Sequence, residues 1–540
     1  MIPMPDKSSS FPKGQVIYQI YPRSFKDTDG DGIGDLSGMI EKLDYVQELG
    51  ATAIWINPIH KSPMADFGYD ISDYYQIDPL FGTLEQYERL LKEAHLKHIQ
   101  VIMDLVVNHT SDQHAWFQES RSSRDNPKRD WYVWKDAQAD GSPPNNWLSV
   151  FGGTAWEFDN HTKQYFLHSF LKEQPDLNWQ NPEVREAIKA VIRYWLDKGV
   201  DGLRMDAVYW YSKDPDFKND PTNPDYRPAV DGPYDRLRHI YSKHGPFLYD
   251  YLNELVAVLK QYESRYMITE LSPHHYNHTV GDYINTYQKI DPLILAPFNF
   301  MFLSLPWDAQ RFQRKINAFQ AALKLEYTPI YLFGNHDQPR LASRIGHDAA
   351  AAAALLLLTL PGTAVIYYGE EIGMENVSIP KDLIKDTWEL NIPNLSKGRD
   401  PERSPMQWSS DEFGGFSTAV PWLPLAASYI ECNIQKQLAD PASLLNLYKH
   451  LLTLRKRSVV LKNGDYLPMH FENPNLFGFS RSFQNQTWAT IINFSHKESA
   501  IIKLNGKIVV CTVSHIEHNN VMQPLEGRVI EIQEHARYAN

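Results

Sequence analysis

Eight short apolar runs, separated mostly by stretches with helical periodicity, constrain the fold of this chain more than any other feature. The runs have strand-like composition and cover residues 16–21, 53–57, 101–106, 202–208, 266–271, 293–302, 329–333 and 363–368. Helical periodicity is clear over residues 84–95, 183–196 and 248–261. This alternation is typical of parallel strands joined by crossover helices. We therefore predict an α/β fold in which eight units close into a (β/α)8 TIM barrel.

Two stretches interrupt the alternation and predict further domains. Residues 109–176 are rich in Asn, Pro, Gly and Trp and lack a helical unit of the barrel type, so we expect an inserted lobe after the third strand. Beyond residue 458 the pattern changes to short alternating segments, which are typical of antiparallel strands in a small β-sandwich. The predicted domains are a catalytic barrel formed by residues 1–108 and 177–458, an inserted lobe at 109–176 and a C-terminal β-sandwich at 459–540.

Charge and cysteine content narrow the class of partner. The chain has 53 basic and 66 acidic residues, a net charge of -13 that disfavours nucleic acid and anionic membranes but suits a neutral sugar. Two cysteines cannot build a disulfide framework, and the first residues lack the pattern of a signal peptide, so we expect a cytoplasmic protein. The most apolar run, 349–360, is too short to cross a bilayer and is predicted to form a buried helix.

Two acidic residues at the ends of strand-like runs indicate a glycosidase. Asp206 lies near the end of the fourth run and Glu270 near the end of the fifth, and the carboxyl ends of barrel strands carry the chemistry of this fold. Side chains two apart on a strand share a face, so Arg204 should lie beside Asp206 and keep it ionised. Glu270, in a less polar setting and near an anion, would keep its proton. A separation of about 5 to 5.5 Å between the two carboxyls permits a covalent glycosyl intermediate and retention of configuration.

Two histidines are expected near the same pocket. His109 follows the third run, and His336 with Asp337 follows the seventh. A histidine next to an aspartate also fits a metal site, and a lone histidine at a strand end is more often structural. The sequence has no His-rich spacing or cysteine pair that completes a zinc site, so binding of sugar hydroxyls is favoured.

Together these segments resemble the α-amylase family of glycoside hydrolases, in its branch of α-glucosidases and oligo-1,6-glucosidases. The resemblance spans nearly the whole chain and rests on the segments 14–25, 67–70, 104–110, 174–178, 202–206, 334–337 and 403–408, with Glu270. By this resemblance, Asp206 is expected to be the nucleophile, Glu270 the general acid and base, and Asp337 a transition-state stabiliser. The resemblance further implies that the subsite of the terminal sugar is lined by His109, Arg204 and His336, with Tyr69 under the sugar ring.

The resemblance also implies removal of terminal glucose units rather than cleavage inside a chain. Asp70 is expected to pair with an arginine from the loop after the eighth strand and to close the pocket around a terminal glucose. We favour Arg399 as the residue that contacts sugar and Arg403 as its support, although two arginines bracing a long loop explain Arg403 almost equally well. Two further residues, Phe151 and Phe170, are expected to form aromatic walls at the pocket mouth.

An acidic, glycine-rich loop follows the first strand. Its oxygen ligands alternate with glycines, as in a loop wrapped around a hard cation, but the twelfth position is Gly38 rather than the glutamate of an EF-hand. In the resembled family this loop holds Ca2+ or Mg2+ in a structural role. The ligands expected by that resemblance are Asp27, Asp29, Asp31, the Ile33 carbonyl and Asp35. The alternative is an acidic turn without an ion, and no organic cofactor is expected.

Linkage preference depends on one residue. Relatives in the resembled branch that prefer α-1,6 bonds usually carry valine after the nucleophile, whereas this chain has Ala207, which favours short α-1,4-linked substrates. The expected activity is a retaining, exo-acting α-glucosidase, with possible transglycosylation. The alternatives are a sucrose isomerase, a trehalose-forming or phosphosugar-acting enzyme of the same family, and a non-enzymatic scaffold like the heavy chains of amino-acid transporters. The expected partner is a small oligosaccharide or disaccharide, and the expected assembly is a monomer or homodimer.

Overall fold

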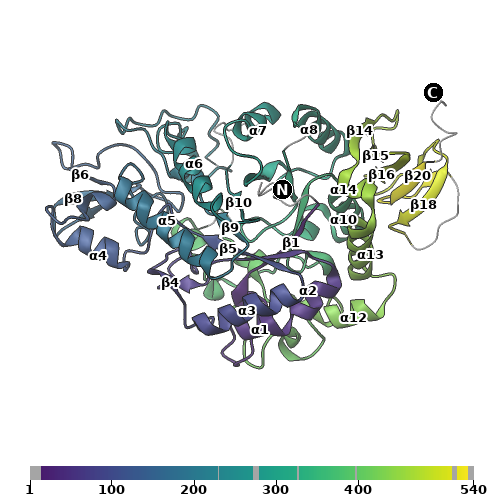
Figure 1. Cartoon of the computed structure of the whole chain (residues 1–540), viewed down its shortest axis with the longest axis horizontal. Helices are drawn as coiled ribbons and strands as arrows, with labels where there is room; N and C mark the ends of the chain where they lie inside the picture. The colour runs from purple at the N-terminus through teal and green to yellow at the C-terminus, as the bar shows by residue number, and fades with distance from the viewer. Residues whose placement is uncertain are drawn as a thin grey trace, which may run out of the picture.

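A closed barrel of eight parallel strands forms the centre of the computed structural model (Figure 1). The structure describes residues 14–228, 230–271, 279–324, 327–393, 395, 398–513 and 520–532. The predicted start of the barrel domain, residues 1–13, and the last residues of the predicted sandwich, 533–540, lie outside the described residues. The barrel strands are β1 Val16–Ile20, β2 Ala53–Ile56, β5 Gln100–Leu105, β9 Gly202–Met205, β10 Tyr266–Thr269, β11 Leu295–Asn299, β12 Ile330–Leu332 and β13 Thr363–Tyr367. All eight predicted strands are therefore confirmed.

Helices cover the outside of the barrel. The segments between the strands include α1 Leu36–Glu41, α2 Leu43–Leu49, α3 Leu84–Leu96, α5 Pro182–Asp197, α6 Leu248–Leu259, α7 Val280–Tyr287, α8 Ala309–Ala322, α9 Leu341–Ile345 and α10 Ala350–Thr359. After β13 the chain continues through α11 Thr387–Asn391, α12 Ile434–Ala439, α13 Leu444–Arg457 and α14 Val459–Asn463. The apolar run forms α10, which lies between the barrel and the C-terminal sheet and is almost entirely buried, as predicted. No helix among the described residues is long and apolar enough to span a membrane.

Alternation along the barrel strands separates two apolar cores. One side of each strand packs against the helices, and the other side fills the barrel interior with residues such as Ile17, Trp55, Ile102, Ile268 and Phe298. Gly202 in β9 lets Tyr266 pack closely in this interior, because a Cβ there would lie 3.0 Å from its ring. Towards the carboxyl ends of the strands, the same inward-facing register continues with polar residues. The packed interior thus forms the floor beneath a polar site.

A separate small sheet lies in the stretch that interrupts the alternation. Its strands are β6 Trp134–Lys135, β8 Gln164–Leu167 and β7 Trp156–Asp159, and α4 Ala115–Ser122 precedes them. The lobe has its own apolar cluster around Trp147 and Trp156. His109 and Asp176 form an antiparallel bridge where the lobe leaves and rejoins the barrel.

A second projection, between β2 and α3, is the hairpin formed by β3 His60–Lys61 and β4 Asp73–Ile77. Its connecting loop, residues 62–72, contributes to the site described below.

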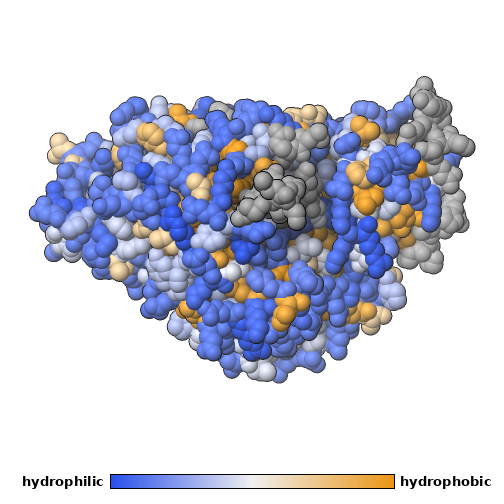
Figure 2. Space-filling view, viewed as in Figure 1, coloured by the Kyte–Doolittle hydropathy of each residue, from blue (hydrophilic) through white to orange (hydrophobic). Residues whose placement is uncertain are grey.

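The C-terminal region is an antiparallel domain on the opposite side of the barrel from the inserted lobe (Figure 1). Its larger sheet has five strands in the order β14 Asp465–Met469, β15 Leu476–Phe483, β16 Gln486–Asn493, β20 Gly527–Ile532 and β18 Gly506–Cys511. A two-stranded sheet, β17 Ala500–Ile501 with β19 Val521–Met522, shares an apolar cluster with it. The predicted antiparallel C-terminal domain is confirmed. The face in Figure 2 is largely hydrophilic, with hydrophobic residues in small groups.

Candidate active site

Strand register gathers one arginine and three carboxylates at the carboxyl end of the barrel. Arg204 in β9 lies opposite Asp104 in β5 and beside β10, whose next residue beyond its end is Glu270. The Arg204 side chain is 2 % exposed, and its Nη1 donates to Asp104 at 2.9 Å and to Asp206 Oδ1 at 2.6 Å. Its Nη2 donates to Glu270 Oε2 at 3.0 Å. A single guanidinium therefore bridges the two predicted catalytic carboxyls from neighbouring strands.

Burial, Arg204 and neighbouring anions all act on the pKa of the two carboxyls. Burial raises the pKa of Glu270, and the neighbouring anions Asp206 and Asp337 add to this effect while Arg204 opposes it. Burial also raises the pKa of Asp206, to about 7, with Arg204 opposing the change and the anions Asp104 and Asp337 adding to it. The backbone N–H of Ala207 donates to Glu270 Oε2 at 3.2 Å. Burial thus raises the pKa of both carboxyls, and Arg204 is the group that favours the ionised form of each.

Asp337 is held as an anion by a cationic wall. Burial acts to raise its pKa, but Arg403 and Arg399 lower it well below the ordinary value. Arg403 Nη2 donates to Asp337 Oδ1 at 2.9 Å, and Arg399 Nη1 lies 3.4 Å from the same oxygen. Arg403 also donates through Nε to the His336 carbonyl at 2.9 Å. Its side chain is fully buried, so Arg403 positions Asp337 from behind.

The two predicted histidines are neutral and held by hydrogen bonds. Burial lowers the pKa of His336 well below its ordinary value, and that of His109 to about 4. His336 Nε2 lies 2.6 Å from the Tyr69 hydroxyl and Nδ1 lies 2.9 Å from Gln19 Nε2. His109 Nε2 lies 3.0 Å from the Tyr69 carbonyl. Neutral rings add no positive charge to the site, which leaves Arg204, Arg399 and Arg403 as its cations.

A cavity of about 200 Å3 opens above these groups. Eight predicted residues line it: Tyr69, His109, Phe151, Phe170, Asp206, Glu270, Asp337 and Arg399. Arg204, His336 and Arg403 support the wall from behind. Ala207, on which the predicted linkage preference depends, also lines the cavity. The lining residues that the sequence did not point to are Asp66, Val150, Tyr209, Trp210, Gln338 and Trp388.

The predicted pairing of Asp70 with an arginine is wrong. Asp70 is fully buried, and its two oxygens accept the backbone N–H groups of Ala65 and Asp66, each at 2.9 Å. The residue that pairs with Arg399 is Asp66, whose Oδ1 accepts from Nη2 at 2.8 Å. Because the loop turns sharply, with positive φ at Met64, Asp70 is needed to satisfy backbone groups inside the turn. Asp66 faces the cavity instead.

Arg399 is fixed by a second acid that the sequence analysis missed. Asp386 accepts from Arg399 Nη2 at 2.7 Å and from Nε at 3.0 Å, and it is fully buried. Asp386 also receives the backbone N–H of Trp388 at the start of α11. The Phe151 ring lies 5.0 Å from the Arg399 guanidinium. Asp386 and Arg399 are therefore one unit that holds Trp388 at the cavity wall.

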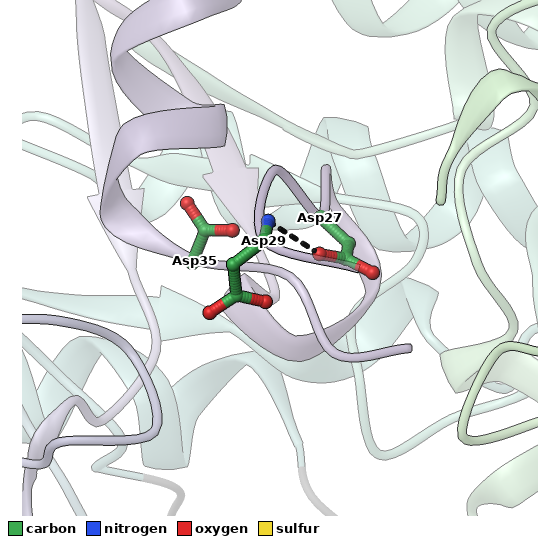
Figure 3. Close-up of side chains that lie close together, drawn as sticks. All are labelled: Asp27, Asp29 and Asp35. Carbon is green, nitrogen blue, oxygen red and sulfur yellow. Dashed lines mark hydrogen bonds between the residues drawn. The ribbon is translucent and has the colours of Figure 1, made fainter. Parts of the chain in front are cut away.

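The acidic loop after β1 brings three of its four aspartates together (Figure 3). Asp27, Asp29 and Asp35 each offer a carboxylate oxygen, and these oxygens lie within 4.8 Å of one another. Asp31 lies outside that group, and its Oδ1 accepts the Ile33 backbone N–H at 2.7 Å. Burial raises the pKa of Asp29, and the neighbouring Asp31 raises it further. A set of crowded carboxylate oxygens fits a hard cation such as Ca2+ or Mg2+.

A (β/α)8 barrel with bridged carboxyls above its strands belongs to the broad class of barrel hydrolases that act on sugars. Comparison with known proteins makes this specific: residues 19–464 match the family model described as "Alpha amylase, catalytic domain", and the chain belongs to the α-amylase family of glycoside hydrolases. It is 41% identical over 539 residues to a probable alpha-glucosidase of Rhizobium meliloti (strain 1021), covering 97% of this chain and 94% of that protein.

Two further comparisons show related enzymes over almost the full length. An oligo-1,6-glucosidase of Parageobacillus thermoglucosidasius is 38% identical, with 96% of this chain and 99% of that protein covered. The crystal structure of the alpha-glucosyl transfer enzyme XgtA superposes with a TM-score of 0.87 at 36% identity, covering 96% of this chain and 99% of that one. The relatives therefore include enzymes named for hydrolysis and for glucosyl transfer.

Proposed function

We propose that this protein is a retaining, exo-acting α-glucosidase that releases glucose from the non-reducing end of short α-glucosides. The observation that carries the proposal is the Arg204 guanidinium, which contacts both Asp206 and Glu270 beneath one cavity. In the first step, ionised Asp206 attacks the anomeric carbon while Glu270 donates its proton to the departing glycosidic oxygen. In the second step, Glu270 takes a proton from water, and that water releases glucose from Asp206.

The surrounding residues support the charge that develops on the sugar. The transition state is positively charged at the anomeric carbon and ring oxygen. Asp337 is anionic throughout, because Arg403 and Arg399 lower its pKa, so it can stabilise that charge and accept sugar hydroxyls. The neutral rings of His336 and His109 add no positive charge that would oppose this stabilisation. Tyr69, which lines the cavity, supplies an aromatic surface for the sugar ring.

Removal of terminal units is supported by the size and closure of the cavity. A volume of about 200 Å3 suits one glucosyl unit, and the Asp66–Arg399 pair lines its wall. We expect Asp66→Ala to lower kcat/KM on maltose by about 10- to 100-fold, because a hydrogen bond to a charged group is worth roughly 1.5–3 kcal/mol. Its melting temperature should stay near that of the wild type, since Arg399 keeps Asp386. Steady-state kinetics and calorimetry measure the two effects.

Asp70→Ala is the matched control for Asp66. It removes the acceptor of two buried backbone N–H groups, so we expect a fall in melting temperature larger than that of Asp66→Ala. If Asp66→Ala kept full activity and only Asp70→Ala lost it, the role assigned to Asp66 would be wrong.

A preference for α-1,4 bonds is supported by Ala207. This residue lines the cavity directly after Asp206 and has a left-handed backbone, with φ 46°. A small side chain leaves room beside the reaction centre where the resembled α-1,6 enzymes carry valine. The test is a panel of maltose, isomaltose, sucrose and trehalose 6-phosphate with anomer-resolved product detection. We expect α-glucose, with maltose the faster of the two glucose disaccharides, and equal rates on maltose and isomaltose would refute the linkage assignment.

Transfer to an acceptor sugar is the second candidate activity. It is favoured by the structural likeness to XgtA, which is named an alpha-glucosyl transfer enzyme. Transfer uses the same two carboxyls, with a sugar hydroxyl replacing water in the second step. Product analysis at rising maltose concentration separates the two, because transfer yields new glucosides whereas hydrolysis yields only glucose. The same panel separates sucrose isomerisation, which would yield a rearranged disaccharide. A non-enzymatic scaffold is disfavoured, because Asp206, Glu270 and Asp337 all line one cavity.

We further propose that the acidic loop binds Ca2+ or Mg2+ in a structural role, with Asp27, Asp29, Asp31, the Ile33 carbonyl and Asp35 as candidate ligands. Asp27 connects this loop to residues 416–417, since it accepts from Ser417 Oγ at 2.5 Å and donates its backbone N–H to the Phe416 carbonyl. A bound ion would therefore brace the long segment after β13.

Removal of the ion should lower stability with little effect on the chemical step. At a hundredfold excess over its Kd, an ion that binds only the folded state adds about 2.7 kcal/mol. We expect a strong chelator to lower the melting temperature of the wild type but not that of Asp29→Asn, which should already melt at the lower temperature. Identical melting curves with and without chelator would remove the ion from this account.

The free thiols Cys432 and Cys511 support a reducing compartment, and we propose a cytoplasmic location on that basis.

A further inference from the structure

A second cavity, of about 920 Å3, lies at the same end of the barrel but shares no lining residue with the catalytic cavity. It is formed by the segments that follow β1, β2 and β13, which contribute Arg23, Phe67 and Lys385 among other residues. Its lining includes the exposed apolar side chains of Leu383 and Val420, which are 40% and 75% exposed. The proposed catalytic mechanism uses none of these residues.

Arg23 in this cavity is buried without an anionic partner. It is only 8% exposed, and the rings of Phe67 and Trp422 lie 5.3 and 4.9 Å from its guanidinium carbon. Both rings lie on one side of the guanidinium, since their centroids are 5.4 Å apart, and its N–H groups still require acceptors. Its Nε has no hydrogen-bond partner but is closed to solvent, and Nη1 reaches only Met64 Sδ at 3.6 Å. Among the described residues, no carboxylate lies within ion-pair distance of Arg23.

The nearby carboxylates do not satisfy this arginine. Asp78 and Asp31 attract Arg23 through space without an ion pair, and the two oxygens of Asp78 accept the backbone N–H groups of Ser62 and Leu80, each at 2.9 Å. A buried guanidinium with free in-plane donors is costly unless an acceptor completes it. Its fork geometry matches the paired oxygens of a phosphate or carboxylate.

The charge of the lining also favours an anion. Lys385 is exposed and adds a second cation to the cavity, against one acid, Glu412. The catalytic cavity has the opposite balance, because its lining includes three acids besides the protonated Glu270, and one arginine. An anionic ligand would therefore be repelled from the catalytic cavity and attracted to this one. The aromatic residues Phe413 and Tyr429 provide apolar surface for an organic body attached to the anion.

We propose that this cavity is a binding site for a small phosphate monoester with a sugar-sized body. Arg23 donates to the phosphate from the part of its guanidinium that lines the cavity, and Lys385 neutralises the remaining charge. The sugar portion packs against Phe413 and Tyr429. The site adjoins the catalytic site through the loop of residues 62–72, because the ring of Phe67 lies 5.3 Å from the guanidinium carbon of Arg23 and 5.8 Å from that of Arg403.

The experiment is a calorimetric titration of the full chain with inorganic phosphate and with glucose 6-phosphate. Glucose is present at saturating concentration, so that the catalytic cavity is filled. We expect one site for each ligand, with glucose 6-phosphate bound more tightly than phosphate. Arg23→Gln should weaken both by at least tenfold, and Lys385→Gln should weaken both by a smaller factor. Arg89→Gln, on the exposed face of α3, is the matched control and should leave both affinities unchanged.

Three outcomes would overturn the proposal. The first is the absence of saturable binding of either ligand to the wild type. The second is an Arg23→Gln variant that binds glucose 6-phosphate as tightly as the wild type does. The third is tighter binding of gluconate than of glucose 6-phosphate, which would assign the site to a carboxylate. If Arg23→Gln does not fold, an unchanged affinity of Lys385→Gln for glucose 6-phosphate would also overturn the proposal. None of these results depends on catalysis, because the same titrations can be made with the Asp206→Ala variant, which contains the same cavity.

Discussion

Asp206→Ala is expected to lower kcat on maltose by roughly 10⁴- to 10⁶-fold, the range seen when a nucleophile is removed from an enzyme that works through a covalent intermediate. The loss is large because no other carboxylate replaces it: Asp104 is fully buried below, and Asp337 is held against Arg403. The fold should remain, since Arg204 keeps its contacts with Asp104 and Glu270. Kinetics with a continuous glucose assay and a melting curve measure both effects.

Asp201→Ala is the matched control for this variant. Asp201 precedes the same strand at the opposite end of the barrel, where it pairs with His95 at 2.7 Å and Arg265 at 3.2 Å. We expect it to lower stability and to leave kcat within a few-fold of the wild type. An Asp206→Ala enzyme with substantial activity, measured on protein free of wild-type contamination, would contradict the proposed nucleophile.

Glu270→Gln is expected to produce the second-largest loss, and its size should depend on the leaving group. Loss of a general acid costs about 10²- to 10⁴-fold on maltose, whose departing sugar must be protonated. An activated aryl α-glucoside needs no such proton, so its first step should be slowed far less. Comparison of pre-steady-state rates on the two substrates measures the difference, and equal losses on both would exclude an acid role for Glu270.

The pH profile gives an independent check on Glu270. Burial and neighbouring anions raise the pKa of Glu270, so the wild-type protein keeps the acid protonated at neutral pH and loses it as the pH rises. The alkaline limb of kcat/KM should therefore reflect this group, and the acidic limb should reflect protonation of Asp206. In Glu270→Gln the alkaline limb should disappear. An alkaline limb that is unchanged in this variant would assign the ionisation to another residue.

Much of the architecture follows from local patterns in the sequence. The eight strands could be predicted because each is a short apolar run between turn residues or helical segments. Helix α10 could be predicted because an apolar run of that length is stable only when it is buried. The inward positions of Arg204 and Asp206 follow from the two-residue repeat of a strand. The contact of Arg204 with Glu270 does not, because it depends on the register between two strands 60 residues apart in the chain.

The loop residues show where local patterns fail. Asp66 and Asp70 lie four residues apart in one turn, and nothing in their spacing reveals that Asp66 faces Arg399 while Asp70 binds backbone N–H groups. Asp386 and Trp388 were missed because they come from the long segment after β13, which has no periodicity to orient its side chains. Such contacts are set by tertiary packing, and only the folded chain reveals them.

Covalent trapping of the glucosyl-enzyme tests the central claim most directly. The Glu270→Gln variant should form this intermediate quickly from an activated α-glucosyl fluoride and break it down slowly, so the adduct should accumulate. Peptide mass spectrometry of the quenched protein should find one added glucosyl unit on Asp206, and none in the Asp206→Ala, Glu270→Gln double variant. A glucosyl unit attached to a different residue, or β-glucose as the first product of the wild-type enzyme with no adduct, would contradict the mechanism.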